Sequence, residues 1–202
     1  MKKGWQTRKL GELCDIERGG SPRPIDSFLT KDPDGINWIK IGDTKNVTKY
    51  ITKTEEKIRP EGAKRSRMVY EGDFILSNSM SFGRPYIMKT TGCIHDGWLV
   101  LRQPKVDQDY LYHVLGSDLV FSQFDRLAAG STVRNLNIGL VETVEIPVPP
   151  LSLNSYGSLP SSIKRLTASP PPKPTPKRTP KTPVPCLKAT CKQSLPSETM
   201  GG

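Results

Sequence analysis

The sequence has little of what catalysis or membrane insertion requires. Its 202 residues include only two histidines, His95 and His113, and contain no G-x-G-x-x-G, P-loop, H-E-x-x-H or G-x-S-x-G motif. No stretch of about 18 apolar residues is present, and the opening segment MKKGWQTRKL lacks the apolar core of a signal peptide. These absences disfavour the common nucleotide-binding, zinc-protease and serine-hydrolase sites, and they predict a cytoplasmic protein without a membrane span.

Cysteine is scarce and gives no sign of a disulfide framework. Cys14 and Cys93 lie far apart, while Cys186 and Cys191 have a C-x4-C spacing with no histidine nearby. Free thiols in a reducing compartment explain this pattern better than a metal site does. The sequence therefore predicts no metal and no cofactor.

Charge and proline divide the chain into two unequal parts. Residues 151–202 hold eight lysines and arginines against one acid, and ten of the nineteen prolines, within a chain whose net charge is +10. Such a composition cannot bury enough apolar surface to offset the entropy of ordering. We therefore predict a folded domain over residues 1–152 and a disordered, basic, proline-rich tail over residues 153–202.

The first part alternates between strand and helix patterns. β-Branched and aromatic runs next to turn residues predict strands at 36–41, 68–70, 74–77, 98–101 and 144–150. Apolar residues at helical spacing over 109–127 predict a helix that Asp109 caps and that Gly116-Ser117-Asp118 interrupts. Several strands with one broken helix, and without a regular βαβ alternation, indicate an α+β domain.

Two catalytic interpretations are possible from single motifs. His95 beside Asp96 could be an oriented base, although a hydrogen-bonded core or rim histidine is the commoner case. Asp34, Asp43 and Lys45 have the form of the PD…D-x-K signature of Mg²⁺-dependent nucleases. Both acids also stand in good turn dipeptides, Asp34-Gly35 and Gly42-Asp43, so the nuclease is retained only as the alternative function.

Three loops are rich in groups that can bind nucleic acid. They are ERGGSPRP at 17–24, SNSMSFGRPY at 77–86 and GSTVRNLN at 130–137. Arginine can bridge guanine O6 and N7, asparagine can pair with adenine, and serine and threonine suit phosphates. Each loop alone is explained by turns and caps, but three on a scaffold without catalytic groups favour recognition over chemistry.

Five segments together resemble a known family. They are WQTRKLGELCDIERGGSPRP, GINWIKIGD, IRPEGAKRSRMVYEGDFILS, DYLYHVLGSD and, most specifically, GSTVRNLNIGLVETVEIPVPPLS. Over residues 5 to 152, in this order, they resemble one target recognition domain of the DNA specificity (S) subunit of type I restriction-modification enzymes. The resemblance implies a mixed, strongly twisted β-sheet with a broken helix, and a non-catalytic subunit that reads half of a split DNA target.

The resemblance also implies partners and a DNA-facing surface. The partners would be double-stranded DNA, methyltransferase and restriction subunits, and a second half-subunit. The DNA-facing regions would be 20–23, 40–45, 77–84 and 131–135. Combined with the polar loops, this predicts contacts from Arg18, Ser21, Arg23, Lys40, Lys45, Ser77, Asn78, Ser79, Arg84, Ser131, Thr132, Arg134 and Asn135.

The tail departs from this family, which continues with a long spacer helix. In the reading frame one nucleotide back, permitted codons from Leu153 onward can spell Glu-Gln-Leu-Arg-Ile-Val-Ala-Ile-Leu and a helix-forming run. A proline codon becomes alanine when G precedes it, which converts a helical run into a proline-rich one. We therefore expect the tail to be an out-of-frame product, with a selected basic linker as the alternative; sequencing of the coding DNA distinguishes them.

Overall fold

The structure is a computed structural model that describes residues 4–79, 83–128 and 135–150. The predicted domain boundary, the tail, and Cys186 and Cys191 lie outside these residues. Cys14 and Cys93 are buried free thiols, as predicted, and burial raises the pKa of Cys14 to about 12. No helix in the described part of the chain is long and apolar enough to cross a membrane.

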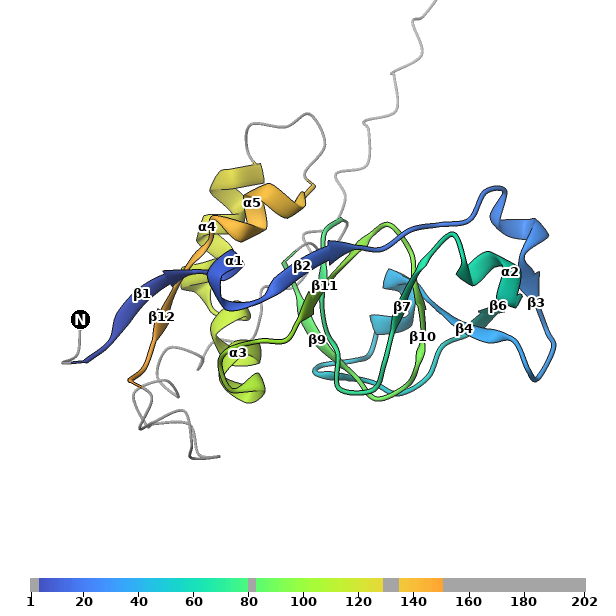
Figure 1. Cartoon of the computed structure of the whole chain (residues 1–202), viewed down its shortest axis with the longest axis horizontal. Coiled ribbons are helices and arrows are strands. Elements are labelled where there is room, and N and C mark those ends of the chain that lie inside the picture. The colour runs from blue at the N-terminus through green and yellow to red at the C-terminus, as the bar shows by residue number, and fades with distance from the viewer. Residues whose placement is uncertain (1–3, 80–82, 129–134, 151–202) are drawn as a thin grey trace, which may run out of the picture.

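The strands form two five-stranded sheets and a two-stranded ribbon (Figure 1). Sheet I has the order β3 (Leu29–Thr30), β6 (Glu56–Ile58), β4 (Ile36–Ile39), β10 (Gly92–Ile94) and β7 (Arg67–Val69). Sheet II has the order β2 (Asp15–Arg18), β11 (Trp98–Arg102), β8 (Phe74–Ser77), β9 (Pro85–Met88) and β5 (Tyr50–Ile51). The ribbon pairs β1 (Gln6–Lys9) with β12 (Glu145–Val148). Each large sheet contains parallel and antiparallel pairs, so the predicted mixed α+β fold is confirmed, with its strands divided among three sheets.

The longer helices gather at the ribbon end of the molecule, away from sheet I (Figure 1). The helices are α1 (Leu10–Leu13), α2 (Pro60–Ala63), α3 (Gln108–Leu115), α4 (Asp118–Ala128) and α5 (Ile138–Glu142), and the 3₁₀ turns are η1 (Ile25–Ser27) and η2 (Ile41–Thr44). The broken helix is confirmed as α3 and α4. Its cap was predicted wrongly: Asp107 accepts the hydrogen bond from the Tyr110 backbone N–H, whereas Asp109 pairs with Lys49.

Strands β8 and β11 explain why the core has two halves. Phe74 and Leu76 on β8 pack toward the helices, while Ile75 between them packs toward sheet I. On β11, Leu99 faces the helices and Trp98 faces sheet I. Since successive side chains of a strand point to opposite faces, a run that is apolar throughout must be covered on both sides. Sheet II is therefore the central layer, between the helices and sheet I.

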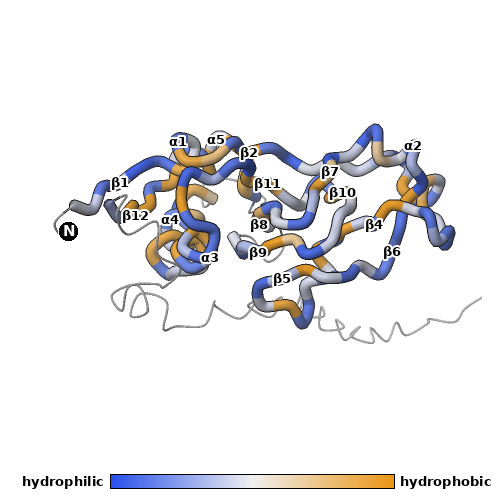
Figure 2. The backbone as a smooth tube through the Cα atoms, turned by 60° about the horizontal axis from the view of Figure 1, so that its bottom comes forward, coloured by the Kyte–Doolittle hydropathy of each residue, from blue (hydrophilic) through white to orange (hydrophobic). Residues whose placement is uncertain are grey.

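Polarity along the chain follows this layering (Figure 2). The tube is hydrophobic along β9 and much of β4, and hydrophilic along β1 and β6. Residues Tyr86 and Met88 of β9 and Ile39 of β4 belong to the cluster between the two sheets. The chain crosses from sheet I to sheet II through the turn His95-Asp96-Gly97, which joins β10 to β11. That turn lies next to the polar loops predicted above.

Candidate nucleic-acid interface

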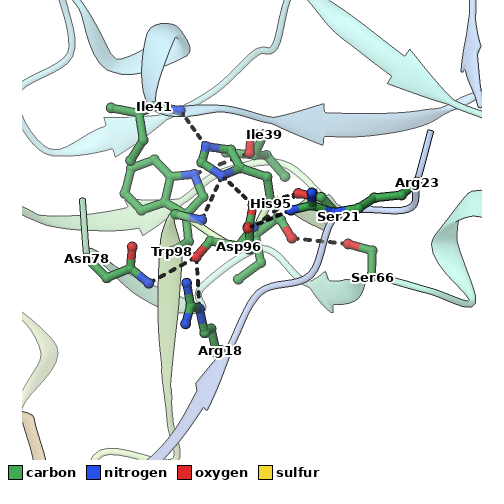
Figure 3. Close-up of polar contacts among 12 residues, drawn as sticks. Arg18, Ser21, Arg23, Ile39, Ile41, Ser66, Asn78, His95, Asp96 and Trp98 are labelled. Carbon is green, nitrogen blue, oxygen red and sulfur yellow. Dashed lines mark hydrogen bonds and ion pairs between the residues drawn. The ribbon is translucent and has the colours of Figure 1, made fainter. Parts of the chain in front are cut away.

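The carboxylate of Asp96 binds the loop that follows β2 (Figure 3). Its Oδ1 accepts a hydrogen bond of 2.7 Å from the Ser21 hydroxyl, and its Oδ2 lies 3.6 Å from Arg23 Nη2. The Ser21 hydroxyl also accepts from the Asp96 backbone N–H, at 3.3 Å. The hydrogen bond from Ser21 lowers the pKa of Asp96 below its ordinary value, so the carboxylate is charged at neutral pH.

The backbone carbonyl of Asp96 binds two further polar side chains. Arg18 Nε and Asn78 Nδ2 each donate to this oxygen at 3.0 Å. Arg18 ends β2 and Asn78 follows β8, so the turn connects two strand ends of sheet II. Four of the predicted side chains therefore meet at one residue, although they are far apart in sequence.

Backbone hydrogen bonds fix the 17–24 loop against the same turn. The Gly19 N–H donates to the Trp98 carbonyl at 2.9 Å, and the Gly20 N–H donates to the Ile94 carbonyl at 3.1 Å. The Ser66 hydroxyl also donates to the Ile94 carbonyl, at 3.1 Å. The loop thus leaves β2 in a defined path, and it presents Arg23 with 82% of its side chain exposed.

The 40–45 segment faces this loop across an open cleft of ≈ 840 Å³. Ser21 and Arg23 line one part of the cleft, and Lys40 and Gly42 line another. The Lys40 ammonium pairs with Glu56 at 2.6 Å, whereas the exposed Lys45 lies in the turn that closes η2. The two predicted regions are therefore neighbours on one surface.

The 77–84 region contributes buried as well as accessible groups. Ser77 and Asn78 are 1% and 0% exposed, and the Ser77 hydroxyl accepts from the Arg84 backbone N–H at 3.0 Å. The backbone carbonyl of Asn78 accepts from the Leu136 N–H at 2.9 Å. This bond places the 77–84 region next to Asn135, the residue before Leu136. Ser79 and Arg84 are half-buried, as is Asn135. Ser77 and Asn78 thus face the protein in this structure, while Ser131, Thr132 and Arg134 lie outside the described residues.

The nuclease alternative finds no support in the arrangement of its three residues. The two oxygens of Asp43 accept from the backbone N–H groups of Lys40 and Glu55, at 2.7 and 3.2 Å. Asp34 lies beyond the other end of β4, in an exposed turn. No group of three or more potential metal ligands occurs within residues 4–79, 83–128 and 135–150. Asp43 is a turn-capping residue, and the predicted PD…D-x-K site does not form.

His95 is a rim histidine whose two ring nitrogens each face a backbone N–H group. The Ile41 N–H points to Nε2 at 3.1 Å and the Gly97 N–H points to Nδ1 at 2.7 Å. A neutral imidazole can accept at one nitrogen, whereas the protonated ring accepts at neither. Burial also lowers the pKa of His95, against the opposing effect of Asp96. The ring therefore serves as a neutral structural acceptor, not as a catalytic base.

Acid is expected to destabilise the protein through His95. The unfolded chain binds a proton near the ordinary histidine pKa of 6.5, and the folded chain binds it only at lower pH. Stability is thus complete above about pH 6.5 and falls as the pH drops toward the lowered pKa. Urea unfolding at about pH 7 and pH 5 should show a smaller pH dependence for His95→Gln than for wild type.

His113 supplies the control for this measurement. Its pKa is also lowered by burial, but its ring is neither in the turn nor bound by these two backbone groups. His113→Gln should retain more of the wild-type pH dependence than His95→Gln. Equal slopes for wild type and His95→Gln would contradict the structural role of this ring.

Asp96 was absent from the predicted site. Its signal was the Asp96-Gly97 pair between two apolar runs, a common turn dipeptide. The sequence contains one other such pair, Asp34-Gly35. Only the pairing of β11 with β2 and β8 brings Arg18, Ser21 and Asn78 to this particular turn.

Comparison with known proteins gives a family and a fold. The model of the type I restriction modification DNA specificity domain matches residues 2–154. The HsdS subunit from Thermoanaerobacter tengcongensis is similar in structure, with a TM-score of 0.58 and 20% identity over 83% of this chain and 37% of that one. A second similar structure is described as the structural basis of complex assembly and conformational transition of the type I R-M system. It has a TM-score of 0.57 and 22% identity, again over 83% of this chain and 37% of that one.

A third similar structure is an enzyme. The type IIG restriction endonuclease BpuSI has a TM-score of 0.54 and 11% identity, over 80% of this chain and 26% of that one. At such identities the three structures establish a shared fold. The chain spans 37% or less of the length of each, so it corresponds to a part of these larger proteins.

Proposed function

The chain belongs to the family of type I restriction-modification DNA specificity domains, and we propose that it reads one half of a split DNA target. Specificity domains of this kind recognise DNA for an enzyme complex whose catalytic centres lie on other subunits. We further propose that its partners are double-stranded DNA, methyltransferase and restriction subunits, and a second half-subunit. The recognition domain would comprise residues 1–152, a boundary that agrees with the end of the family match at residue 154.

The observation that carries this proposal is the meeting of three polar regions around one turn. The Asp96 turn binds the 17–24 loop and Asn78, and the neighbouring His95 binds the backbone of Ile41. Arginine and serine side chains on such a surface can bind phosphates and guanine edges. Arg23 and Lys40 supply positive charge on the two sides of the cleft, and Lys45 is exposed in the turn that closes η2.

Selection from a pool of randomised DNA duplexes tests the reading function of the full 202-residue chain. Enrichment of one short sequence is expected, with weak and salt-sensitive affinity because one half-site offers few contacts. A chain that enriches no sequence at low salt would overturn the proposal. Mapping of methylated DNA in cells that also express methyltransferase subunits tests whether the chain assembles with them. Assembly should lead to modification at a defined split sequence.

Lys45→Ala is expected to weaken binding to all duplexes about equally. An exposed lysine that contacts phosphate adds counterion release without reading bases, so the slope of log affinity against log salt should decrease by about 1. Lys9→Ala is the control, because Lys9 is an exposed residue of β1, which lies in the two-stranded ribbon and away from sheet I (Figure 1). Equal slopes of log affinity against log salt for Lys45→Ala and Lys9→Ala would show that Lys45 does not contact DNA.

A further inference from the structure

Asp96 holds the predicted DNA-reading side chains in two separable ways. Its carboxylate binds Ser21 and Arg23, and its backbone carbonyl binds Arg18 and Asn78. A substitution at this position removes the carboxylate and leaves the carbonyl. The structure therefore allows Ser21 and Arg23 to lose their carboxylate partner while the contacts of Arg18 and Asn78 and the backbone hydrogen bonds of the 17–24 loop are retained.

The hydrogen bond between Ser21 and Asp96 is the shortest of three carboxylate contacts, the others being to Arg23 and to His95 Nδ1, each at 3.6 Å. It is a short, charge-assisted bond of 2.7 Å, and bonds of this type are about twice as strong as neutral ones. The Arg23 pair is longer, at 3.6 Å, and its guanidinium is mostly exposed, so it contributes little to stability. Arg23 is thus directed by Asp96 and yet remains available to a ligand.

We propose that Asp96 is a positioning residue for DNA reading, a role that rests on the proposed function. Its carboxylate orders the 17–24 loop through the hydrogen bond with Ser21. Its ion pair with Arg23 restricts the conformations of that side chain and keeps it at the cleft. Arg23 leaves the carboxylate for a DNA acceptor when the duplex binds. The Asp96 carboxylate is not itself a DNA contact.

The direction of the change in affinity for the enriched sequence separates this role from that of an ordinary surface charge. A carboxylate near a DNA surface repels phosphates, so its removal alone should strengthen binding to every sequence. Loss of loop order should instead weaken binding to the enriched sequence, because base edges are read by groups held in a fixed geometry. Asp96→Ala is therefore expected to raise nonspecific affinity and to lower specific affinity.

The test uses the full chain, the duplex enriched by the wild type and a scrambled duplex of equal length. For Asp96→Ala, the ratio of specific to nonspecific affinity should fall about tenfold, the effect of losing one well-placed base contact. Ser21→Ala should lower the same ratio without the rise in nonspecific affinity. Since both substitutions break one interaction, the double variant should lose less than the two single effects combined.

Two further variants control for charge and for folding. Asp26 is an exposed acid that lines the same cleft, so Asp26→Ala removes a like charge but should leave the ratio unchanged. Asp96→Asn keeps an oxygen that can accept from Ser21, so it should retain more of the ratio than Asp96→Ala. Thermal unfolding of each variant shows whether a loss of affinity reflects unfolded protein. If Asp96→Ala is unfolded, the ratio of specific to nonspecific affinity in Ser21→Ala tests the role of Asp96 instead.

Three outcomes would count against this role. An unchanged ratio in Asp96→Ala and Ser21→Ala would overturn it, and so would fully additive effects in the double variant. A ratio that falls equally in Asp26→Ala would assign the effect to charge alone. If the wild type enriches no sequence, the proposed reading function itself is wrong. If the wild type enriches a sequence and the variants bind it equally well, only the role of Asp96 is wrong.

Discussion

Trp98→Ala is expected to destabilise the domain by about 3–5 kcal/mol, the usual cost of removing a large buried aromatic side chain. Trp98 is fully buried between the two large sheets, and its ring packs edge-on against Tyr86 with centroids 5.7 Å apart. Its indole N–H donates to the Ile39 carbonyl at 3.2 Å, so alanine also removes this hydrogen bond and leaves that buried acceptor only the longer bond, of 3.4 Å, from the His95 backbone N–H. Urea unfolding at neutral pH measures the change in the free energy of unfolding.

Tyr70→Ala is the matched control for this substitution. Tyr70 is also a large aromatic residue, but its side chain is 55% exposed, so its removal should change stability by less than about 0.5 kcal/mol. Trp98→Phe should fall between the two, because it keeps an aromatic ring and loses the hydrogen bond. Similar stabilities for Trp98→Ala and Tyr70→Ala would contradict the packing of sheet I on sheet II.

Gly19→Ala is expected to destabilise the domain by about 1–3 kcal/mol, the range for an overpacked site, and to impair DNA reading as well. A Cβ at Gly19 would lie 2.1 Å from the His95 carbonyl oxygen and 2.8 Å from the Ile94 carbonyl oxygen. Both atoms are backbone, so the clash is relieved only if the loop moves away from the turn. That movement breaks the Gly19 and Gly20 hydrogen bonds and separates Ser21 from Asp96.

Gly42→Ala separates this clash from the general effect of replacing a glycine. Gly42 lies in η2 on the other side of the cleft, and a Cβ there would have no atom within 4 Å. Its substitution should leave the melting temperature nearly unchanged. For a domain of this size, each kcal/mol lowers the melting temperature by about 2–4 °C, so the two variants are readily distinguished by calorimetry. Equal melting temperatures would show that the loop is not seated against the turn.

Local sequence patterns predicted strands well where both faces are buried. The run Phe74–Ser77 is β8 with the predicted bounds, and the predicted 98–101 strand is β11, one residue longer. The imperfect alternation at 36–41 has a physical cause: Trp38 packs on the outer face of sheet I, and Ile39 packs between the sheets. The strand itself ends at Ile39, and η2 follows where a continued strand was predicted.

Short elements held by distant contacts were not predicted from the sequence. Helix α5 has only five residues, and its visible signal is the Asn137 cap that accepts from the Leu140 N–H. Strands β3 and β5 have two residues each and depend on pairing with β6 and β9. Such elements are too short to show a period, so their structure comes from partners elsewhere in the chain.

The sequence by itself determined the family, the α+β class and the loops rich in arginine, serine and asparagine that we propose to bind DNA, because these depend on residue types and their order along the chain. Tertiary structure alone decided which of those side chains share a surface. It buries Ser77 and Asn78, exposes Arg23, and makes Asp96 the residue where Arg18, Ser21, Arg23 and Asn78 meet. The reason is physical: these contacts depend on the pairing of β2, β8 and β11, which joins segments separated by dozens of residues, and no local pattern encodes that pairing.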